Sequence, residues 1–139
     1  MAESEERKYT ILVVDDDPDI QTSISIALED LKQNLIKASD GLAALELAEA
    51  EDPDIVILDI MLPKRGGFQV LQKLKGVPKM KGKRPLVCMM TGNEGMRHKQ
   101  FAEMHGVDDY LQKPFPMPRI VEIVQGFIAR LDKGIENAK

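Results

Sequence analysis

Acidic, hydroxyl and ammonium side chains stand at the ends of four short apolar runs in the sequence. Three acids follow the first run, one acid the second, a threonine the third and a lysine the fourth: Asp15, Asp16, Asp17, Asp59, Thr91 and Lys113. Converging carboxylates with no His or Cys beside them suit a hard cation, and a few oxygen ligands with waters suit Mg²⁺. The hydroxyl and the ammonium add donors for a further anionic group. Together these groups predict a site for phosphoryl chemistry.

The acids in this set differ in their surroundings, and this predicts different roles. A carboxylate can act as a nucleophile and form an acyl phosphate, and Asp59 is the candidate because it stands alone after its run. Asp15 and Asp16 are adjacent, so a bound cation would relieve their repulsion and they are candidate metal ligands. A single Asp after a strand is usually a helix cap or a solvated turn residue. The prediction therefore depends on the whole set.

The apolar runs are typical of parallel strands that are buried on both faces, because they are short, continuous and rich in β-branched residues. We predict strands at Tyr9–Val14, Leu35–Ala38, Ile55–Leu58, Leu86–Met90 and Tyr110–Gln112. Helical spacing of apolar residues between and after these strands predicts five helices. Their apolar residues are Ile20, Ile24, Ala27, Leu28 and Leu31; Leu42, Leu45 and Ala48; Phe68, Val70, Leu71 and Leu74; Met96, Phe101 and Met104; and Ile120, Ile123, Val124, Phe127, Ile128 and Leu131.

Residues with special backbone preferences mark the ends of these elements. Asp17 is the expected N-cap of the first helix, with Pro18 in its first turn. Pro63, Gly66 and Gly67 predict a loop before the third helix, and Gly106 predicts a left-handed end to the fourth. The pattern is therefore (βα)₅, which implies an α/β fold with a parallel sheet and helices on both faces. Ligands bind at the carboxyl ends of the strands in such sheets, where the set above lies.

Length and composition bound the possibilities further. The chain has 139 residues and a net charge of −4, which predicts one domain over 1–139, with a core of about 9–131 and no effector domain. The N-terminus lacks a secretory pattern, and no apolar run is long enough to cross a membrane. The lone Cys88 excludes a disulfide framework. We therefore expect a cytoplasmic protein that does not associate with membranes.

Four segments resemble the receiver domain of two-component response regulators, in the order and spacing of that family: Ile11–Asp17, Ile55–Pro63, Cys88–Gly92 and Asp108–Phe115. The resemblance covers roughly Tyr9 to Leu131. It implies a flavodoxin-like three-layer sandwich with strand order 2-1-3-4-5. It also implies a signalling domain in a phosphorelay, which is not an enzyme in the ordinary sense but promotes its own phosphorylation and dephosphorylation.

The same resemblance implies roles for individual residues. Asp59 would accept a phosphoryl group from a phosphohistidine on a histidine kinase or a histidine phosphotransfer protein. Asp16, Asp59 and the backbone carbonyl of Met61 would hold Mg²⁺, or Mn²⁺ in its place, with assistance from Asp15. Lys113 would contact the acyl phosphate, and Lys113–Pro114 would be a cis peptide. Thr91 and Tyr110 would form the switch, with Tyr110 turning inward once Thr91 moves.

The switch is expected to rearrange one face of the domain, made of the fourth helix, the fifth strand and the fifth helix. This face comprises Glu94–His105, Tyr110 and Met117–Ile128, and would bind a downstream partner or a second copy of the chain. The chain is acidic overall, so no binding to nucleic acid is expected. The eight basic residues between Ile60 and Asn93 are read as a solvated surface, with docking of an acidic partner as the alternative.

The sequence departs from the family pattern beside the predicted site. The loop after Pro63 contains Lys64, Arg65 and Gly66, which puts its conformation in doubt. Neither Met61 nor Asn93 offers an acid to orient an attacking water, which predicts slow self-dephosphorylation.

Three alternatives concern the function as a whole. A haloacid-dehalogenase-like phosphohydrolase would use Asp15 as its nucleophile, but it requires an acidic pair after the lysine that this chain lacks. A calcium loop starting at Asp15 fails, because its sixth position is Ile20 instead of glycine. A receiver that only binds partners, without phosphorylation, stays open. So does the choice between a stand-alone receiver and one excised from a longer protein.

Overall fold

The computed structural model describes residues 8–62, 66–75, 85–92, 100, 103–104 and 106–137. Five parallel strands form one sheet in the order β2-β1-β3-β4-β5, as predicted. The strands are β1 (Thr10–Val14), β2 (Asn34–Ala38), β3 (Ile55–Asp59), β4 (Leu86–Thr91) and β5 (Asp109–Gln112). The central strand β3 is buried along its whole length. This burial on both faces explains why its sequence is continuously apolar before Asp59.

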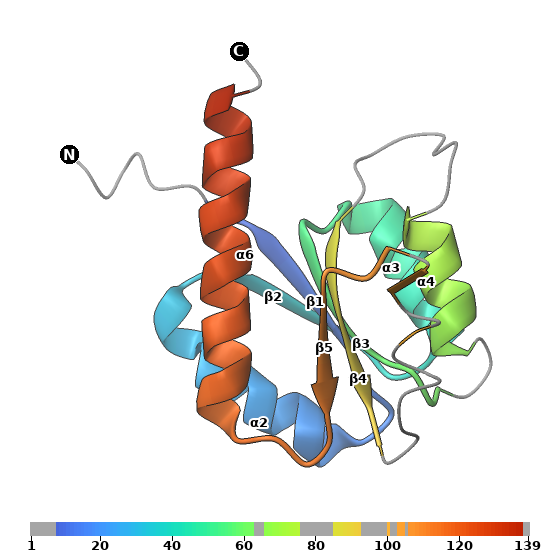
Figure 1. The fold of residues 1–139 in the computed structure, drawn as a ribbon. Helices are drawn as coiled ribbons and strands as arrows, with labels where there is room; N and C mark the ends of the chain where they lie inside the picture. Colours follow the sequence, from blue (N-terminus) through green and yellow to red (C-terminus); the bar gives the residue numbers. More distant parts are fainter. Residues whose placement is uncertain are drawn as a thin grey trace.

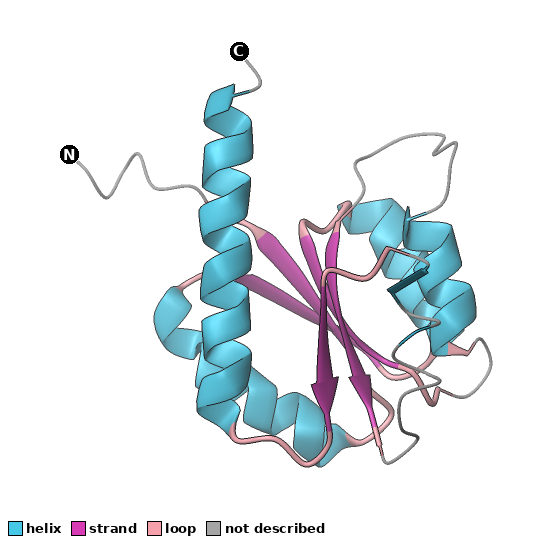
Figure 2. Ribbon diagram, viewed as in Figure 1, coloured by secondary structure: helices cyan, strands magenta, loops and turns pink. Residues whose placement is uncertain are grey.

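Helices cover both faces of the sheet and make a three-layer sandwich (Figure 1). One face is covered by α2 (Pro18–Leu28), which continues as the 3₁₀ turn η1 (Glu29–Leu31), and by α6 (Met117–Asn137). The other face is covered by α3 (Gly41–Glu51) and α4 (Gly67–Lys75). Figure 2 shows the sheet between these two pairs of helices. The chain therefore has the predicted flavodoxin-like architecture.

Alternate residues of the central strands point into two separate apolar cores. Leu12, Val14, Val56, Leu58 and Met89 pack on the side of α3 and α4. Their neighbours in the chain, among them Ile11, Val13, Ile57 and Met90, pack on the side of α2 and α6. This alternation is the two-residue period of an extended strand. Packing on both faces fixes the register of the strands, so the residues just after β1, β3, β4 and β5 lie at the same edge of the sheet.

The helix ends follow the predicted chemistry at most positions. The carboxylate of Asp17 accepts from the amide of Asp19 and caps α2, with Pro18 in the first turn. Asp40 caps α3 by accepting from the amide of Ala43. Gly106 has a φ of +88°, the left-handed conformation predicted for it.

Two expectations about the helices are wrong in detail. Leu42 was placed on the apolar face of α3, but it is exposed, and Ala44 is buried instead. Gly67 was placed in a loop, but it is buried and opens α4. The last helix, α6, continues beyond Leu131 to Asn137, and the hydroxyl of Tyr9 donates to the carboxylate of Asp132 on this extension.

Several predictions fall outside the described part of the chain. The fourth predicted helix lies mostly there, although Glu103 and Met104 have helical backbone. Lys64, Arg65, Asn93 and most of the basic stretch also lie outside it.

Candidate functional site

The turn after β1 carries three of the predicted acids, and its backbone is held from several sides. The amide of Asp15 donates to the carbonyl of Ala38 at 3.1 Å and so extends the pairing of β1 with β2 by one residue. The side chain of Asp15 is fully buried, and its Oδ1 accepts from the amide of Asp17 at 2.9 Å. Asp16 lies between them and is exposed. The turn thus presents one buried and one exposed carboxylate.

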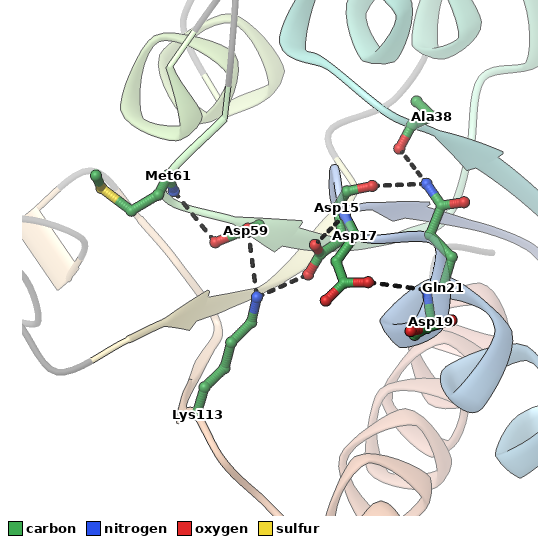
Figure 3. Close-up of polar contacts among 8 residues, drawn as sticks. All are labelled: Asp15, Asp17, Asp19, Gln21, Ala38, Asp59, Met61 and Lys113. Carbon is green, nitrogen blue, oxygen red and sulfur yellow. Dashed lines mark hydrogen bonds and ion pairs between the residues drawn. The ribbon is translucent and has the colours of Figure 1, made fainter.

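Asp59 is the last residue of β3 and is 4% exposed. Its Oδ1 accepts from the amide of Met61 at 3.1 Å (Figure 3). Burial raises the pKa of Asp59, because a charge loses hydration there. The Met61 amide and the ammonium of Lys113 counteract this shift only in part. A buried carboxylate with so little hydration gains strongly from any cation that approaches it.

Lys113 joins the acids of two different strands. Its Nζ donates to Oδ2 of Asp15 at 2.8 Å and to Oδ2 of Asp59 at 3.3 Å (Figure 3). Its amide donates to the carbonyl of Thr91 at 2.6 Å, which anchors it to the end of β4, and Lys113–Pro114 is the predicted cis peptide. Burial disfavours the ammonium, but the bonds and charges of Asp15 and Asp59 outweigh this effect and raise the pKa of Lys113.

The structure brings the three candidate metal ligands together. One carboxylate oxygen each from Asp15, Asp16 and Asp59 lies within 4.8 Å of the others. An all-oxygen donor set fits Mg²⁺ or Mn²⁺ better than a soft metal. Among the described residues, three carboxylates against one ammonium leave two negative charges, which a divalent cation would cancel. The residues present therefore fit the predicted ion, and its further ligand, the carbonyl of Met61, stays a prediction.

Thr91 and Tyr110 lie on neighbouring strands. Thr91 ends β4 and is 1% exposed. Tyr110 is the second residue of β5, opposite Met89, and it packs against the core on the side of α3 and α4. Its hydroxyl is buried and has no hydrogen-bond partner among the described residues. The ring thus points inward in this structure, and its rotation with Thr91 stays a prediction.

Two residues that shape the site were not singled out from the sequence. A Cβ atom on Gly67 would lie 2.5 Å from the carbonyl oxygen of Asp59, so the glycine allows α4 to start against the end of β3. The amide of Gln21 contacts the backbone of Asp15. Gln21 shares helical spacing with Ile24 and Leu28, so a polar residue on an apolar face was the available signal. Nothing local marks the close approach at Gly67.

Comparison with known proteins identifies the family. Residues 11–125 match the model of the response regulator receiver domain. The chain is 38% identical over 120 residues to the alkaline phosphatase synthesis transcriptional regulatory protein PhoP of Bacillus subtilis, covering 86% of this chain and 48% of the relative. It is 36% identical over 135 residues to the DNA-binding regulator RpaA of Synechocystis, covering 93% and 53%. The chain thus spans about half the length of these relatives.

Solved structures agree with this match. A CheY-like response regulator receiver domain protein from Methanospirillum hungatei superposes with a TM-score of 0.82 at 25% identity, covering 92% of this chain and 99% of that one. The BeF3-activated receiver domain DrrB has a TM-score of 0.78 at 26% identity, covering 88% and 99%. With one acidic pocket at the carboxyl ends of a 2-1-3-4-5 sheet, and with a family match that runs through every strand, this chain belongs to the receiver domains of two-component response regulators.

Proposed function

We propose that Asp59 is the phosphoacceptor of this receiver domain, and that it takes a phosphoryl group from a phosphohistidine on a histidine kinase or a histidine phosphotransfer protein. The observation that carries this proposal is that Asp59 lies beside both the other acids of the site and its lysine. Its carboxylate lies in the cluster with Asp15 and Asp16, and it accepts from Lys113. No other acid in the described part of the chain lies both in that cluster and at the end of the central strand.

The transfer is a displacement at phosphorus. A carboxylate oxygen of Asp59 forms the new P–O bond while the P–N bond of the phosphohistidine breaks, and its electron pair leaves with the imidazole nitrogen, which takes up a proton. Lys113 stands at Oδ2 of Asp59 and is placed to contact the phosphoryl oxygens as the acyl phosphate forms. Hydrolysis of that acyl phosphate later returns Asp59 to its starting state.

A divalent cation supports this chemistry through the acids of the pocket. Asp16 and Asp59, with the carbonyl of Met61, would hold Mg²⁺ or Mn²⁺. Asp15 would assist, since both of its carboxylate oxygens already accept hydrogen bonds. When bound, the ion neutralises charge on the equatorial phosphoryl oxygens. The buried Asp59 has the most to gain from it, because in the described part of the chain its charge is compensated by Lys113 and the amide of Met61 against a larger cost of burial.

Phosphorylation would act on partners through Thr91 and Tyr110. Thr91 ends β4, and Tyr110 lies on the neighbouring strand β5. A contact between Thr91 and a phosphoryl oxygen would therefore move Thr91 and change the surroundings of Tyr110. The responding face would include Tyr110 and Met117–Ile128 on α6, and it would bind a downstream protein or a second copy. The 139 residues would form one receiver domain, act in the cytoplasm and bind no nucleic acid through this domain.

The test is the intact mass of the protein after incubation with Mg²⁺ and acetyl phosphate. Asp59→Asn removes the nucleophile, and Asp54→Asn is its matched control, because Asp54 precedes the same strand and its carboxylate accepts from the amide of Thr10 at the opposite end. We expect wild type and Asp54→Asn to gain one phosphoryl group. Asp59→Asn and samples with EDTA should gain none.

Other results of this experiment would change the proposal. Phosphorylation of Asp59→Asn would place the nucleophile elsewhere in the pocket. If wild type gains no phosphoryl group from acetyl phosphate or from a phosphohistidine protein, a role in partner binding alone is the better account. A half-life of seconds would contradict the expected slow self-dephosphorylation, which rests on the lack of an acid at Met61.

A further inference from the structure

A buried amide side chain lies beneath the acidic turn. Gln21 is on the first turns of α2 and is only 9% exposed. Its Nε2 donates to the carbonyl of Asp15 at 2.7 Å and to the carbonyl of Ala38 at 2.8 Å (Figure 3). It also lies 3.4 Å from the hydroxyl of Ser39. One side chain thus joins the end of β1 to the end of β2.

The carbonyl of Asp15 needs such a partner because the sheet ends here. Ala38 closes β2, and its oxygen already accepts from the amide of Asp15, the last bond between the two strands. The carbonyl of Asp15 lies beyond the last paired residue of β1 and receives no bond from the sheet. Both donors of one amide group satisfy these two oxygens. Without them, the Ala38 carbonyl would keep its bond from Asp15, but the buried Asp15 carbonyl would lack a partner among the described residues.

The bond to the Asp15 carbonyl has a consequence for Asp16. The peptide between Asp15 and Asp16 is planar, so holding its oxygen also fixes the direction in which the chain enters Asp16. The next peptide is held from the other side, because the amide of Asp17 donates to Oδ1 of Asp15 at 2.9 Å. Asp16 is exposed and therefore has little packing to orient it. Its position is set by these two peptide planes.

We propose that Gln21 is a positioning residue for the metal-binding acids, and that it acts through the Asp15 carbonyl to hold Asp16 facing Asp59. This inference rests on the proposed function, because it assumes that the acids hold a divalent cation. Residues that hold metal ligands in place without touching the ion affect the affinity for the metal strongly, typically by tenfold or more. Gln21 differs from the ligands in that it touches neither ion nor phosphoryl group.

The test compares Gln21→Met with Gln33→Met. Methionine has nearly the same shape as glutamine but cannot donate to the carbonyl groups. Gln33 is the matched control, because it is half-buried and, like Gln21, bonds to backbone: it accepts from the amide of Tyr9 and donates to the carbonyl of Leu31. Tyr9 lies just before β1, whereas Asp15 lies just after it, so the control perturbs the end of the strand away from the acids.

Binding of Mn²⁺ is measured from the electron paramagnetic resonance signal of the free ion, with Mg²⁺ as competitor, at a temperature where circular dichroism shows each variant folded. We expect Gln33→Met to bind Mn²⁺ as wild type does, and Gln21→Met to bind about tenfold more weakly. A merely structural Gln21 would lower the unfolding temperature without changing the affinity of the folded protein. Equal affinity in wild type and Gln21→Met overturns the inference, as does an equal loss in both variants.

Two further arms separate the possible failures. If Gln21→Met does not fold, Gln21→Asn replaces it, because the shorter amide cannot reach both carbonyl groups. We again expect weaker binding, and wild-type affinity would overturn the inference. If wild type itself binds neither ion, the metal site of the proposed function fails and the inference fails with it. If wild type binds, Asp16→Asn does not and Gln21→Met binds normally, only the inference fails.

Discussion

Gly67→Ala provides a sharp test of how the backbone around Asp59 is packed. A Cβ atom at this position would lie 2.5 Å from the carbonyl oxygen of Asp59, 2.5 Å from Cα of Ile60 and 2.8 Å from the carbonyl oxygen of Ile60. Ordinary contacts of a Cβ atom begin at 3.4 Å. All three neighbours are backbone atoms, so no side chain can rotate to make room. The start of α4 must move away from β3 by nearly 1 Å.

The loss of stability in Gly67→Ala depends on which segment moves to make room for the Cβ atom. The end of β3 is fixed between β1 and β4, so the displacement falls on α4 and on the bond from the Gly67 amide to the Ile60 carbonyl, now 3.0 Å. Overpacking of this kind costs about 1–3 kcal/mol. The better helix propensity of alanine offsets at most about 1 kcal/mol. We therefore expect a net loss of about 1–2 kcal/mol in the free energy of unfolding.

Urea denaturation followed by circular dichroism measures this loss directly. Gly66→Ala is the matched control, because a Cβ atom at the preceding residue would meet nothing within 4 Å. It should change the free energy of unfolding by less than about 0.5 kcal/mol. Gly67→Ala should also weaken Mn²⁺ binding, since Asp59 is next to the displaced atoms. Equal stability of Gly67→Ala and wild type, or an equal loss in Gly66→Ala, would refute the reasoning.

Three more substitutions test the charges and polar groups of the structure. Burial raises the pKa of Asp59, so the charged carboxylate costs stability once the pH exceeds that pKa. Without a divalent cation, Asp59→Asn should therefore have a higher free energy of unfolding than wild type at pH 7. This gain, followed by thermal denaturation in EDTA, should shrink on acidification; an undiminished gain at pH 4 would contradict it. Tyr110→Phe removes a buried hydroxyl that has no described partner, so urea denaturation should show unchanged stability or a gain of up to about 1 kcal/mol, and a loss would reveal a missing partner. Asp108→Asn breaks the 2.8 Å ion pair with Lys75 at the other end of the sheet, and should cost about 2 kcal/mol in urea denaturation while leaving Mn²⁺ binding unchanged.

The strands and the pocket were predictable because both depend on residue type at short range. A strand that is buried on both faces has a continuous apolar sequence, and the first polar residue after it marks the edge of the sheet. Asp15, Asp59, Thr91 and Lys113 are such residues, and the structure places all four at one edge. Their convergence follows from the parallel direction of the strands. The sequence contains all the information that this step requires.

Features that depend on contacts between distant segments were not predictable in the same way. In α3, alanine and leucine occur on every side, so spacing alone did not distinguish buried Ala44 from exposed Leu42. The end of α6 looked polar and terminal, yet the helix continues, with Asp132 bonded to Tyr9 from the other end of the chain. Gly67 and Gln21 act on residues in other elements. Each depends on a neighbour that only the folded chain supplies.

Among the described residues, the acids of the pocket outnumber the one ammonium group that contacts them. Lys113 is shared between Asp15 and Asp59 and is closer to Asp15, so the acid proposed as nucleophile has the weaker hold on the ammonium. A divalent cation among the acids would compensate Asp59 and leave Lys113 able to contact an incoming phosphoryl group instead. The repulsion between these carboxylates also explains why hydrogen bonds from neighbouring amide groups hold the acids in place. Carboxylates that repel one another stay together without a cation only if the chain around them is fixed. The backbone amides of Asp17 and Met61 bond to these carboxylates, and the side-chain amide of Gln21 bonds to the carbonyl of Asp15.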